Sequence, residues 1–254
     1  HGQVINFDPQ QIYIWRAIEE VPRTASTGAP LSIRIQELEK IANETWVANE
    51  QEEVGGWIFR ADVGVTRRAN SALILGTDNQ IDKCITWYRD RNLQPTVSLV
   101  PDINEELDIE LERRNFRKLL DLDVMVKDPV DREIDFEFEA FDVPSSEWLA
   151  VHEDEAIKPL LLRTPSKYVE FRIEKDLFAI GRIAFASDWA VISRIWVSPT
   201  MRSKGYGRKV LHALESLAKG SKLALQVQRE NENAFQLYLS EGYKTHHTGR
   251  FRSQ

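Results

Sequence analysis

Two glycines one residue apart, Gly205 and Gly207, mark the point where an apolar stretch of this chain gives way to an amphipathic one. The stretch at 190–197 is rich in β-branched and aromatic residues and is followed by Pro199, so it predicts a strand. Apolar residues then recur at helical spacing over 210–218, which predicts a helix with one buried face. The chain must therefore turn tightly from a strand into a helix at the glycine pair.

A turn of this kind is able to bind an anion. The first amide groups of a helix lack partners within the helix, and the helix dipole places positive charge at the same end. Three basic residues, Arg202, Lys204 and Arg208, surround the glycines. The pattern is neither a Walker loop nor a dinucleotide fingerprint. The sequence favours a phosphate-binding turn, and the alternative is an ordinary loop with solvated basic side chains.

A second motif follows the first. Residues 223–228 predict another short strand, and the stretch after it carries a fixed pattern: Asn231, Ala234, Leu237, Tyr238, Gly242 and Tyr243. Together with the Arg-x-x-Gly-x-Gly turn, this order resembles the GCN5-related N-acetyltransferase (GNAT) superfamily. The resemblance implies an α/β (α+β) fold class made of tandem GNAT-like folds. Each would have a mixed, mostly antiparallel central sheet flanked by helices, with strands that splay apart at a cleft for coenzyme A.

The same resemblance implies that acetyl-CoA is the co-substrate and assigns residues to it. The pantetheine arm would contact backbone groups of Ile195, Trp196 and Val197. The pyrophosphate would lie on the turn formed by Arg202, Ser203, Lys204, Gly205, Tyr206, Gly207 and Arg208. Asn231 would contact the cofactor, with Asn233 as a weaker candidate. The alternative role for Asn231 is to cap its helix.

Tyr238 is the residue that the resemblance makes the general acid, which protonates the departing thiolate of coenzyme A. It stands seven residues after Asn231, so both side chains lie on one helix face. A phenol has a pKa near 10, which matches the basicity of a leaving thiolate. The alternative is a core aromatic.

The general base stays unassigned by the sequence. Many relatives carry a glutamate on the motif strand, yet residues 190–197 contain no carboxylate. The candidates are Asp188, Glu170, and Ser193 acting through a water. His246 and His247 are neighbours in a predicted strand, so we expect their side chains to point to opposite faces, each as a surface or satisfied histidine.

Composition narrows the partners. A net charge of −7 gives no support for nucleic acid or an anionic membrane. The single cysteine, Cys84, excludes a disulfide framework within the chain and is expected to be a buried thiol. No residue spacing indicates a metal site. We expect a cytoplasmic protein whose acceptor is a small-molecule or peptide amine.

The chain divides into three predicted parts. Residues 1–30 form a hairpin and linker, and because the chain opens with His1 we expect a remnant of a larger segment. Residues 31–130 form a degenerate GNAT-like domain without the glycine turn, and 131–254 form the catalytic GNAT domain. A Gly-Gly-Trp segment at 55–57 and Arg-Ala-Asn-Ser at 68–71 resemble a group of actinobacterial-type acetyltransferases.

The predicted function is therefore an acetyl-CoA-dependent N-acetyltransferase. A primary amine of unknown identity would attack the thioester directly in a ternary complex. Two alternatives stay open at this point. The protein is a CoA-binding sensor or scaffold that does not turn over, or it is a protein or peptide N-acetyltransferase.

Overall fold

The computed structural model describes residues 33–62, 66–152 and 155–254. The hairpin and linker predicted within 1–30 lie outside the described residues. The first part of the described chain contributes, in order, α1 (Ile35–Glu44), β1 (Glu50–Val54), β2 (Trp57–Ala61), β3 (Ala72–Ile74), α2 (Ile81–Arg89), β4 (Thr96–Leu99), α3 (Glu105–Arg113) and β5 (Arg117–Lys127).

The second part begins with β6 and ends with β11. Its elements are β6 (Glu139–Phe141), α4 (Ser146–Ala150), α5 (Lys158–Leu161), β7 (Ser166–Ile173), β8 (Asp176–Ala186), β9 (Trp189–Val197), α6 (Tyr206–Leu217), β10 (Lys222–Gln228), α7 (Glu232–Ser240) and β11 (Lys244–Ser253). Short 3-10 turns precede several helices, among them η3 (Pro101–Ile103) and η5 (Pro199–Met201).

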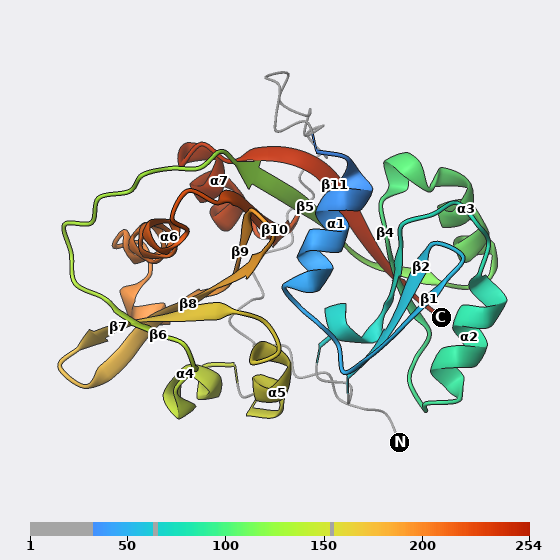
Figure 1. Cartoon of the computed structure of the whole chain (residues 1–254), viewed down its shortest axis with the longest axis horizontal. Helices are drawn as coiled ribbons and strands as arrows, with labels where there is room; N and C mark the ends of the chain where they lie inside the picture. Colours follow the sequence, from blue (N-terminus) through green and yellow to red (C-terminus); the bar gives the residue numbers. More distant parts are fainter. Residues whose placement is uncertain (1–32, 63–65, 153–154) are drawn as a thin grey trace.

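The described strands form one continuous eleven-stranded sheet in the order β1-β2-β3-β4-β11-β5-β10-β9-β8-β7-β6 (Figure 1). Most neighbouring pairs are antiparallel, and the β3–β4 and β9–β10 pairs are parallel. The two expected sheets are thus merged into one sheet, and strands of the two parts alternate at their boundary. β11 lies between β4 and β5, and β5 lies between β11 and β10. Each part of the chain therefore places its last strand inside the other part's portion of the sheet.

The Gly-Gly-Trp segment forms a tight hairpin. Val54 pairs with Trp57, and both intervening glycines have positive φ, 54° at Gly55 and 76° at Gly56. A two-residue turn with two positive φ angles is the turn that matches the twist of antiparallel strands. This turn explains why the polar stretch of β1 becomes a strand although its sequence carries no apolar alternation.

Helices cover the sheet with their apolar faces. α6 buries Val210, Leu211 and Leu214 against β7, β8 and β9, as its spacing predicts. α1 lies over the middle of the sheet, where β5 and β11 cross from one part to the other (Figure 1). Cys84 is buried in the first part, which confirms the predicted buried thiol, and burial raises its pKa to about 12.

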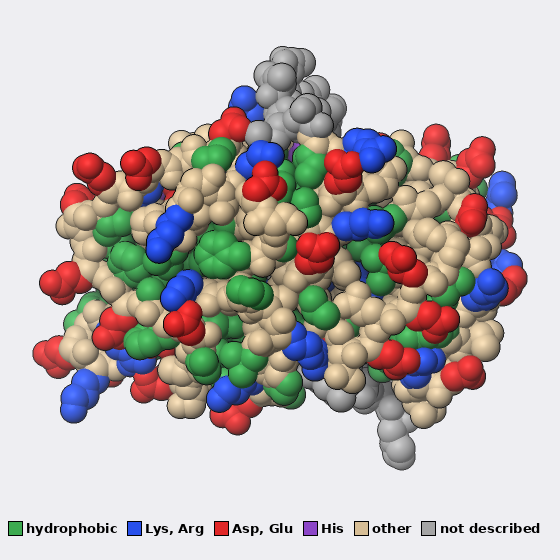
Figure 2. Space-filling model, in the orientation of Figure 1, with side chains coloured by type: hydrophobic (Ala, Val, Ile, Leu, Met, Phe, Trp, Pro, Cys, Tyr) green, Lys and Arg blue, Asp and Glu red, His purple; other side chains and the backbone are tan. Residues whose placement is uncertain are grey.

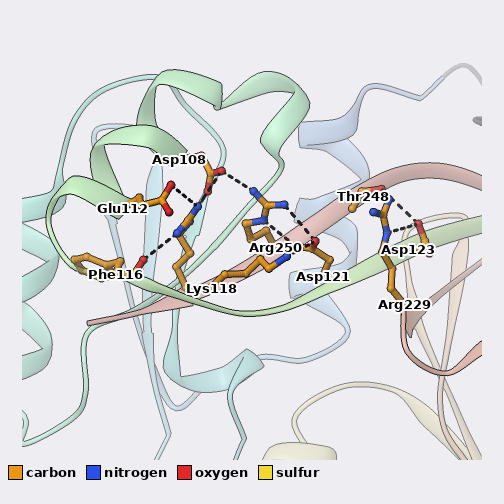
Figure 3. Close-up of polar contacts among 10 residues, drawn as sticks. Asp108, Glu112, Phe116, Lys118, Asp121, Asp123, Arg229, Thr248 and Arg250 are labelled. Carbon is orange, nitrogen blue, oxygen red and sulfur yellow. Dashed lines mark hydrogen bonds and ion pairs between the residues drawn. The ribbon is translucent and has the colours of Figure 1, made fainter. Parts of the chain in front are cut away.

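An ion-pair network fixes β11 to the first part of the chain (Figure 3). Asp108 of α3 accepts hydrogen bonds from Arg250 at 2.7 Å and from Arg252 at 2.6 Å, both on β11. Arg250 also donates to Asp121 on β5 at 2.7 Å, and Arg252 donates to the Phe116 carbonyl at 3.0 Å. The C-terminal strand is thereby held by charge as well as by its strand pairing.

No described helix is both long and apolar enough to cross a membrane. The division of the chain at residue 130 stays a prediction.

Candidate functional site

The parallel strands β9 and β10 stop pairing part of the way along their length. Pairing runs from Trp189 with Lys222 to Ile192 with Leu225 and stops there, although both strands continue. On its other side, β9 pairs with β8, and this pairing shifts register between Ser193 and Trp196. The shift marks a bulge at Arg194, whose φ is 58°. A bulge bends its strand. We call residues 193–197 and 226–228 the splay; Ile195, Trp196 and Val197 lie in it and are half-buried.

The amino end of α6 lies next in the chain after the splay. Gly205 caps this helix with φ 85°, a left-handed conformation that glycine adopts without strain, and no atom lies within 4 Å of a Cβ built on it. The helical ladder begins with Lys209 N–H donating to the Gly205 carbonyl at 3.1 Å. The backbone N–H groups of the first turn, up to Arg208, therefore precede the first bond of the helix, and such groups can donate hydrogen bonds to a ligand.

The glycine pair serves two different purposes. A Cβ on Gly207 would meet Leu237 of α7 at 3.5 Å, an ordinary contact. Gly205 is thus required by backbone conformation, whereas Gly207 lies at the α6–α7 contact. Ser203 has a φ of 61° and is exposed, and Tyr206 packs its ring edge against Phe178 with centroids 4.7 Å apart.

The three basic residues of the turn point in different directions. Arg202 donates from Nε to the Val197 carbonyl at 3.1 Å, which joins the turn to the end of β9. Lys204 is exposed, and its Nζ lies 3.7 Å from the Met201 sulfur. Arg208 donates to Glu241 at 2.5 Å, so a carboxylate offsets its charge. Arg202 and Lys204 are the better-placed charges for an anion on this turn.

Asn231 and Asn233 begin α7. The Asn231 side chain accepts a hydrogen bond from the Ala234 amide at 3.2 Å, so its capping role is confirmed. Asn233 is exposed on the first turn. Contact of either residue with a cofactor stays a prediction.

Tyr238 belongs to the apolar core cluster against which Ile195 and Val197 of the splay pack. Its side chain is 9% exposed, and its ring centroid lies 5.9 Å from that of Tyr243. Burial raises the pKa of Tyr238 to about 12. The phenol therefore holds its proton at neutral pH, and it is a weaker acid than the free phenol whose pKa near 10 matches a leaving thiolate. Tyr238 belongs to the core, and its role as general acid stays a prediction.

The three candidate bases lie in different places. Asp188 precedes β9 at the end away from the splay, where its hydrogen bond to Lys222, at 3.0 Å, lowers its pKa. Glu170 is buried on β7 and accepts hydrogen bonds from Ser145 at 2.5 Å and Arg172 at 2.6 Å. Ser193 lies at the beginning of the splay, and its buried Oγ has no partner among the described residues. Of the three, the structure brings Ser193 to the site.

His152 is a further candidate that the sequence did not indicate. It follows α4, its Nε2 is buried with no partner among the described residues, and burial together with the positive charge of Arg194 lowers its pKa to about 4. The imidazole is therefore neutral at physiological pH and lies near the bulge of β9. A lone histidine after a short helix belongs to no recognisable spacing, so only the fold reveals it.

The expectation that His246 and His247 point to opposite faces was wrong. β11 has a bulge between Thr245 and His247, which turns both rings to the same side. Their Nδ1 atoms lie 2.8 Å apart, and His247 Nε2 lies 2.9 Å from Glu39 of α1. The pair attaches α1 to β11, away from the splay.

An apolar surface accompanies the basic turn. Figure 2 shows hydrophobic side chains gathered on the half of the molecule where Figure 1 places β8, β9 and α6. The core cluster that contains the buried face of α6 has Ile195, Val197, Met201 and Tyr206 among the partly buried residues packed against it. Among the described residues, no group of three His, Cys, Asp or Glu side chains is arranged to hold a metal ion. The splay and the turn together fit a ligand with an apolar arm and an anionic end.

Comparisons with known proteins identify a family and relatives for this chain. A family model described as "Probable histone acetyltransferase Rv0428c C-terminal" matches residues 32–252. The probable histone acetyltransferase Rv0428c of Mycobacterium tuberculosis is 27% identical over 98% of this chain and 82% of its own length. The uncharacterized N-acetyltransferase YobR of Bacillus subtilis is 25% identical over 82% of this chain and 94% of its own length.

Solved structures confirm the fold class. A GCN5-related N-acetyltransferase from Kribbella flavida superposes with a TM-score of 0.68 at 15% identity, covering 86% of this chain and 95% of that one. A conserved protein of unknown function from Staphylococcus epidermidis superposes with a TM-score of 0.61 at 13% identity, covering 82% and 94%.

Proposed function

Because the chain belongs to the family described as probable histone acetyltransferase Rv0428c C-terminal, within the GNAT superfamily, we propose that it transfers an acetyl group from acetyl-CoA to a primary amine. The observation that carries the proposal is the splay of β9 and β10 beside the Gly205 end of α6. Backbone groups of β9 would hold the pantetheine arm, and the amides of the turn with Arg202 and Lys204 would hold the phosphates. Acetyl-CoA supplies the activated acetyl group as a thioester.

The amine would attack the thioester carbonyl directly, with both substrates bound. Holding the two reactants together removes most of the entropic cost of their encounter. A backbone amide of the splayed β9 would polarise the carbonyl oxygen, since β9 lacks its ladder to β10 beyond Ile192. The C–N bond forms and the C–S bond breaks, and Tyr238 would deliver a proton to the departing thiolate.

The attacking amine must also lose a proton. Ser193, with its unpartnered Oγ, would position a water that accepts it, and neutral His152 is a second candidate for this water. Glu170 is already held by Ser145 and Arg172, and Asp188 by Lys222, which favours Ser193 over both. β9 contains no carboxylate that could accept this proton.

Two alternatives differ in what they predict. A CoA-binding sensor or scaffold would bind acetyl-CoA without turnover. A protein or peptide N-acetyltransferase would turn over with a peptide amine and not with small amines. The name of the M. tuberculosis relative favours trying basic peptides, and the net charge of −7 is compatible with a cationic acceptor.

The test is a screen for thiol release with acetyl-CoA and three classes of acceptor: small amines, amino acids, and lysine-rich peptides. Mass spectrometry would identify a product heavier by one acetyl group. Acetyl-CoA binding with no acetylated product in any class would favour the sensor. Acetylation confined to the peptides would identify the protein-acetyltransferase alternative.

A further inference from the structure

The two faces of the sheet differ at β8 and β9. A Cβ on Gly181 of β8 would meet Leu214 and Val210 of α6 at 2.7 Å and 2.8 Å, so this position faces α6. Successive residues of a strand point to opposite faces, so Arg182 faces away from α6. Ser193 of β9 pairs directly with Arg182 in the antiparallel ladder and shares its face. The water that Ser193 would position for the attacking amine therefore lies on the face opposite to α6.

Three arginines surround the ring of Trp46 on this face. Trp46 follows α1 and packs with residues of α4, α5, β7 and β8 in one apolar cluster. The Cζ atoms of three arginines lie close to its ring centroid: Arg182 of β8 at 5.1 Å, Arg194 of β9 at 5.6 Å and Arg68 of the 3-10 turn η2 (Arg68–Asn70) at 5.7 Å. Cations from both parts of the chain thus meet beside the splay.

The charges of two of these arginines are held without a carboxylate. Arg182 is 1% exposed, and its Nη2 donates to neutral acceptors, the Thr45 carbonyl and the hydroxyls of Thr164 and Ser166. Arg68 is half-buried, and among the described residues its guanidinium makes no hydrogen bond or ion pair. Burial lowers the pKa of Arg68 to about 10, so the group is charged at neutral pH. Like charges at this separation repel, and the indole ring offsets part of that cost.

The carboxylates nearest to these arginines are engaged elsewhere. Glu39 of α1 attracts Arg68, yet its Oε1 lies 2.9 Å from Nε2 of His247. Glu170 of β7 accepts a hydrogen bond from Arg172 at 2.6 Å. Positive charge is therefore left in excess around the Trp46 ring, although the whole chain carries a net charge of −7.

This excess charge indicates the class of acceptor. Arg68 and Arg194 are half-buried, so solvent reaches both side chains. Arginine binds a carboxylate through two parallel hydrogen bonds, and such a pair is strengthened where the protein partly excludes water. We propose that the acceptor is an amino acid or another amine with a carboxylate, which binds at Arg68 while the amine faces Ser193. This inference rests on the proposed acetyl transfer and names the substrate class of that same site.

The experiment measures thiol release from acetyl-CoA with matched pairs of acceptors. The panel contains α-amino acids and ω-amino acids, each beside its own amide, so the two members of a pair differ in the charged carboxylate. Lysine-rich peptides with an amidated C-terminus represent acceptors without one. The test variant is Arg68→Gln. The matched control is Arg67→Gln, the same substitution at the neighbouring residue, whose guanidinium lies over the ring of Phe251 instead of Trp46.

We expect turnover with one or more amino acids and a kcat/KM at least about tenfold lower for the matching amide. Arg68→Gln should lower kcat/KM for the acid by at least about tenfold, mainly by raising KM, and should change kcat/KM for the amide little. The Kd for acetyl-CoA should stay the same, because Arg68 faces the acceptor. Arg67→Gln should behave as the wild type does.

Thermal unfolding separates this role from a structural one. Because Arg68 makes no hydrogen bond, Arg68→Gln should keep or raise Tm. Arg60→Gln should lower Tm by several degrees, because Arg60 is buried and donates to Asn43 and Ser71.

Three results would overturn this inference and leave the acetyl transfer standing. They are equal kcat/KM for acid and amide, turnover confined to amides or lysine-rich peptides, and a loss of Tm in Arg68→Gln as large as that in Arg60→Gln. Acetyl-CoA binding without an acetylated product from any acceptor would contradict the transfer and this inference together.

Discussion

The two parallel strand pairs of this molecule share a topology and differ in the residues at their junctions. After β9 the chain reaches Gly205 and basic side chains at the beginning of α6, and the strands have already separated at Ile192. After β3 the chain reaches a loop that Asn104 bonds to the next junction, and the surrounding side chains are acidic. The same strand order thus carries junction residues of opposite charge in the two parts of the molecule.

The same comparison shows that the two parts are not independent bodies. β5 pairs with β10 of the second part, and β11 pairs with β4 of the first. A fragment that ends at residue 127 would lose β11 from between β4 and β5. The predicted absence of a coenzyme A site in the first part is therefore best tested in the whole chain.

The largest expected effect comes from Tyr238→Phe, which removes one hydroxyl and keeps the ring. If Tyr238 is the general acid, kcat should fall by about 10²–10⁴-fold with an identified amine, while the Kd for acetyl-CoA stays the same. Tyr243→Phe is the matched control, since its ring lies 5.9 Å away in the same cluster. A Tyr238→Phe enzyme with wild-type kcat, under conditions where product release does not limit turnover, would make Tyr238 a core aromatic only.

The next effect concerns the network that joins the two parts (Figure 3). Asp108→Ala would leave Arg250 and Arg252 without their shared carboxylate and should lower the free energy of unfolding by about 3 kcal/mol. Asp82→Ala is the control, because Asp82 is 82% exposed in its pair with Arg114 and should cost under about 1 kcal/mol.

Urea unfolding followed by circular dichroism and tryptophan fluorescence measures both variants. Because the strands are exchanged, we expect one transition with coincident probes. Two separate transitions would show that the parts unfold independently. Equal losses of unfolding free energy in the two variants would show that the network does not stabilise the fold.

A smaller effect is the pH dependence contributed by His152. Its pKa is about 4 in the folded protein and about 6.5 when unfolded. The unfolded state therefore binds the proton first, so this contribution to stability is present above about pH 6.5 and is lost as the pH falls toward 4. We expect a loss on the order of 1–3 kcal/mol over that interval. His152→Gln should show a shallower decline in unfolding free energy between pH 6.5 and 4.5; an identical slope would mean that His152 is solvated.

Much of the fold followed from local patterns. The helical spacing of 210–218 predicted α6, and the β-branched and aromatic residues of 190–197 predicted β9, because these residues pack in the apolar core. The pairing of β11 between β4 and β5 had no local signature, since it depends on contacts between residues more than a hundred positions apart. β1 was missed because its residues are exposed and polar, and it forms through the turn at Gly55 and Gly56.

The candidate site was partly predictable for a similar reason. The glycine turn and Tyr238 lie in contiguous motifs, so the sequence carries both. The choice among Asp188, Glu170 and Ser193 required the fold, because hydrogen bonds to Lys222, Ser145 and Arg172 occupy the two carboxylates. The bulge that turns His246 and His247 to one side also depends on register with β5, which adjacent residues do not encode.

Titration calorimetry of the whole chain with acetyl-CoA tests the central claim most directly. We expect one site per chain. Gly205→Asp should weaken binding at least about tenfold, or 1.4 kcal/mol, because it places a negative charge at the phosphate position. Gly205→Asn, which also tolerates positive φ and is neutral, should retain far more affinity, and Thr77→Asp at the first junction should change nothing. Two sites per chain, or wild-type affinity in Gly205→Asp, would contradict the assignment of the acetyl-CoA site to the second part.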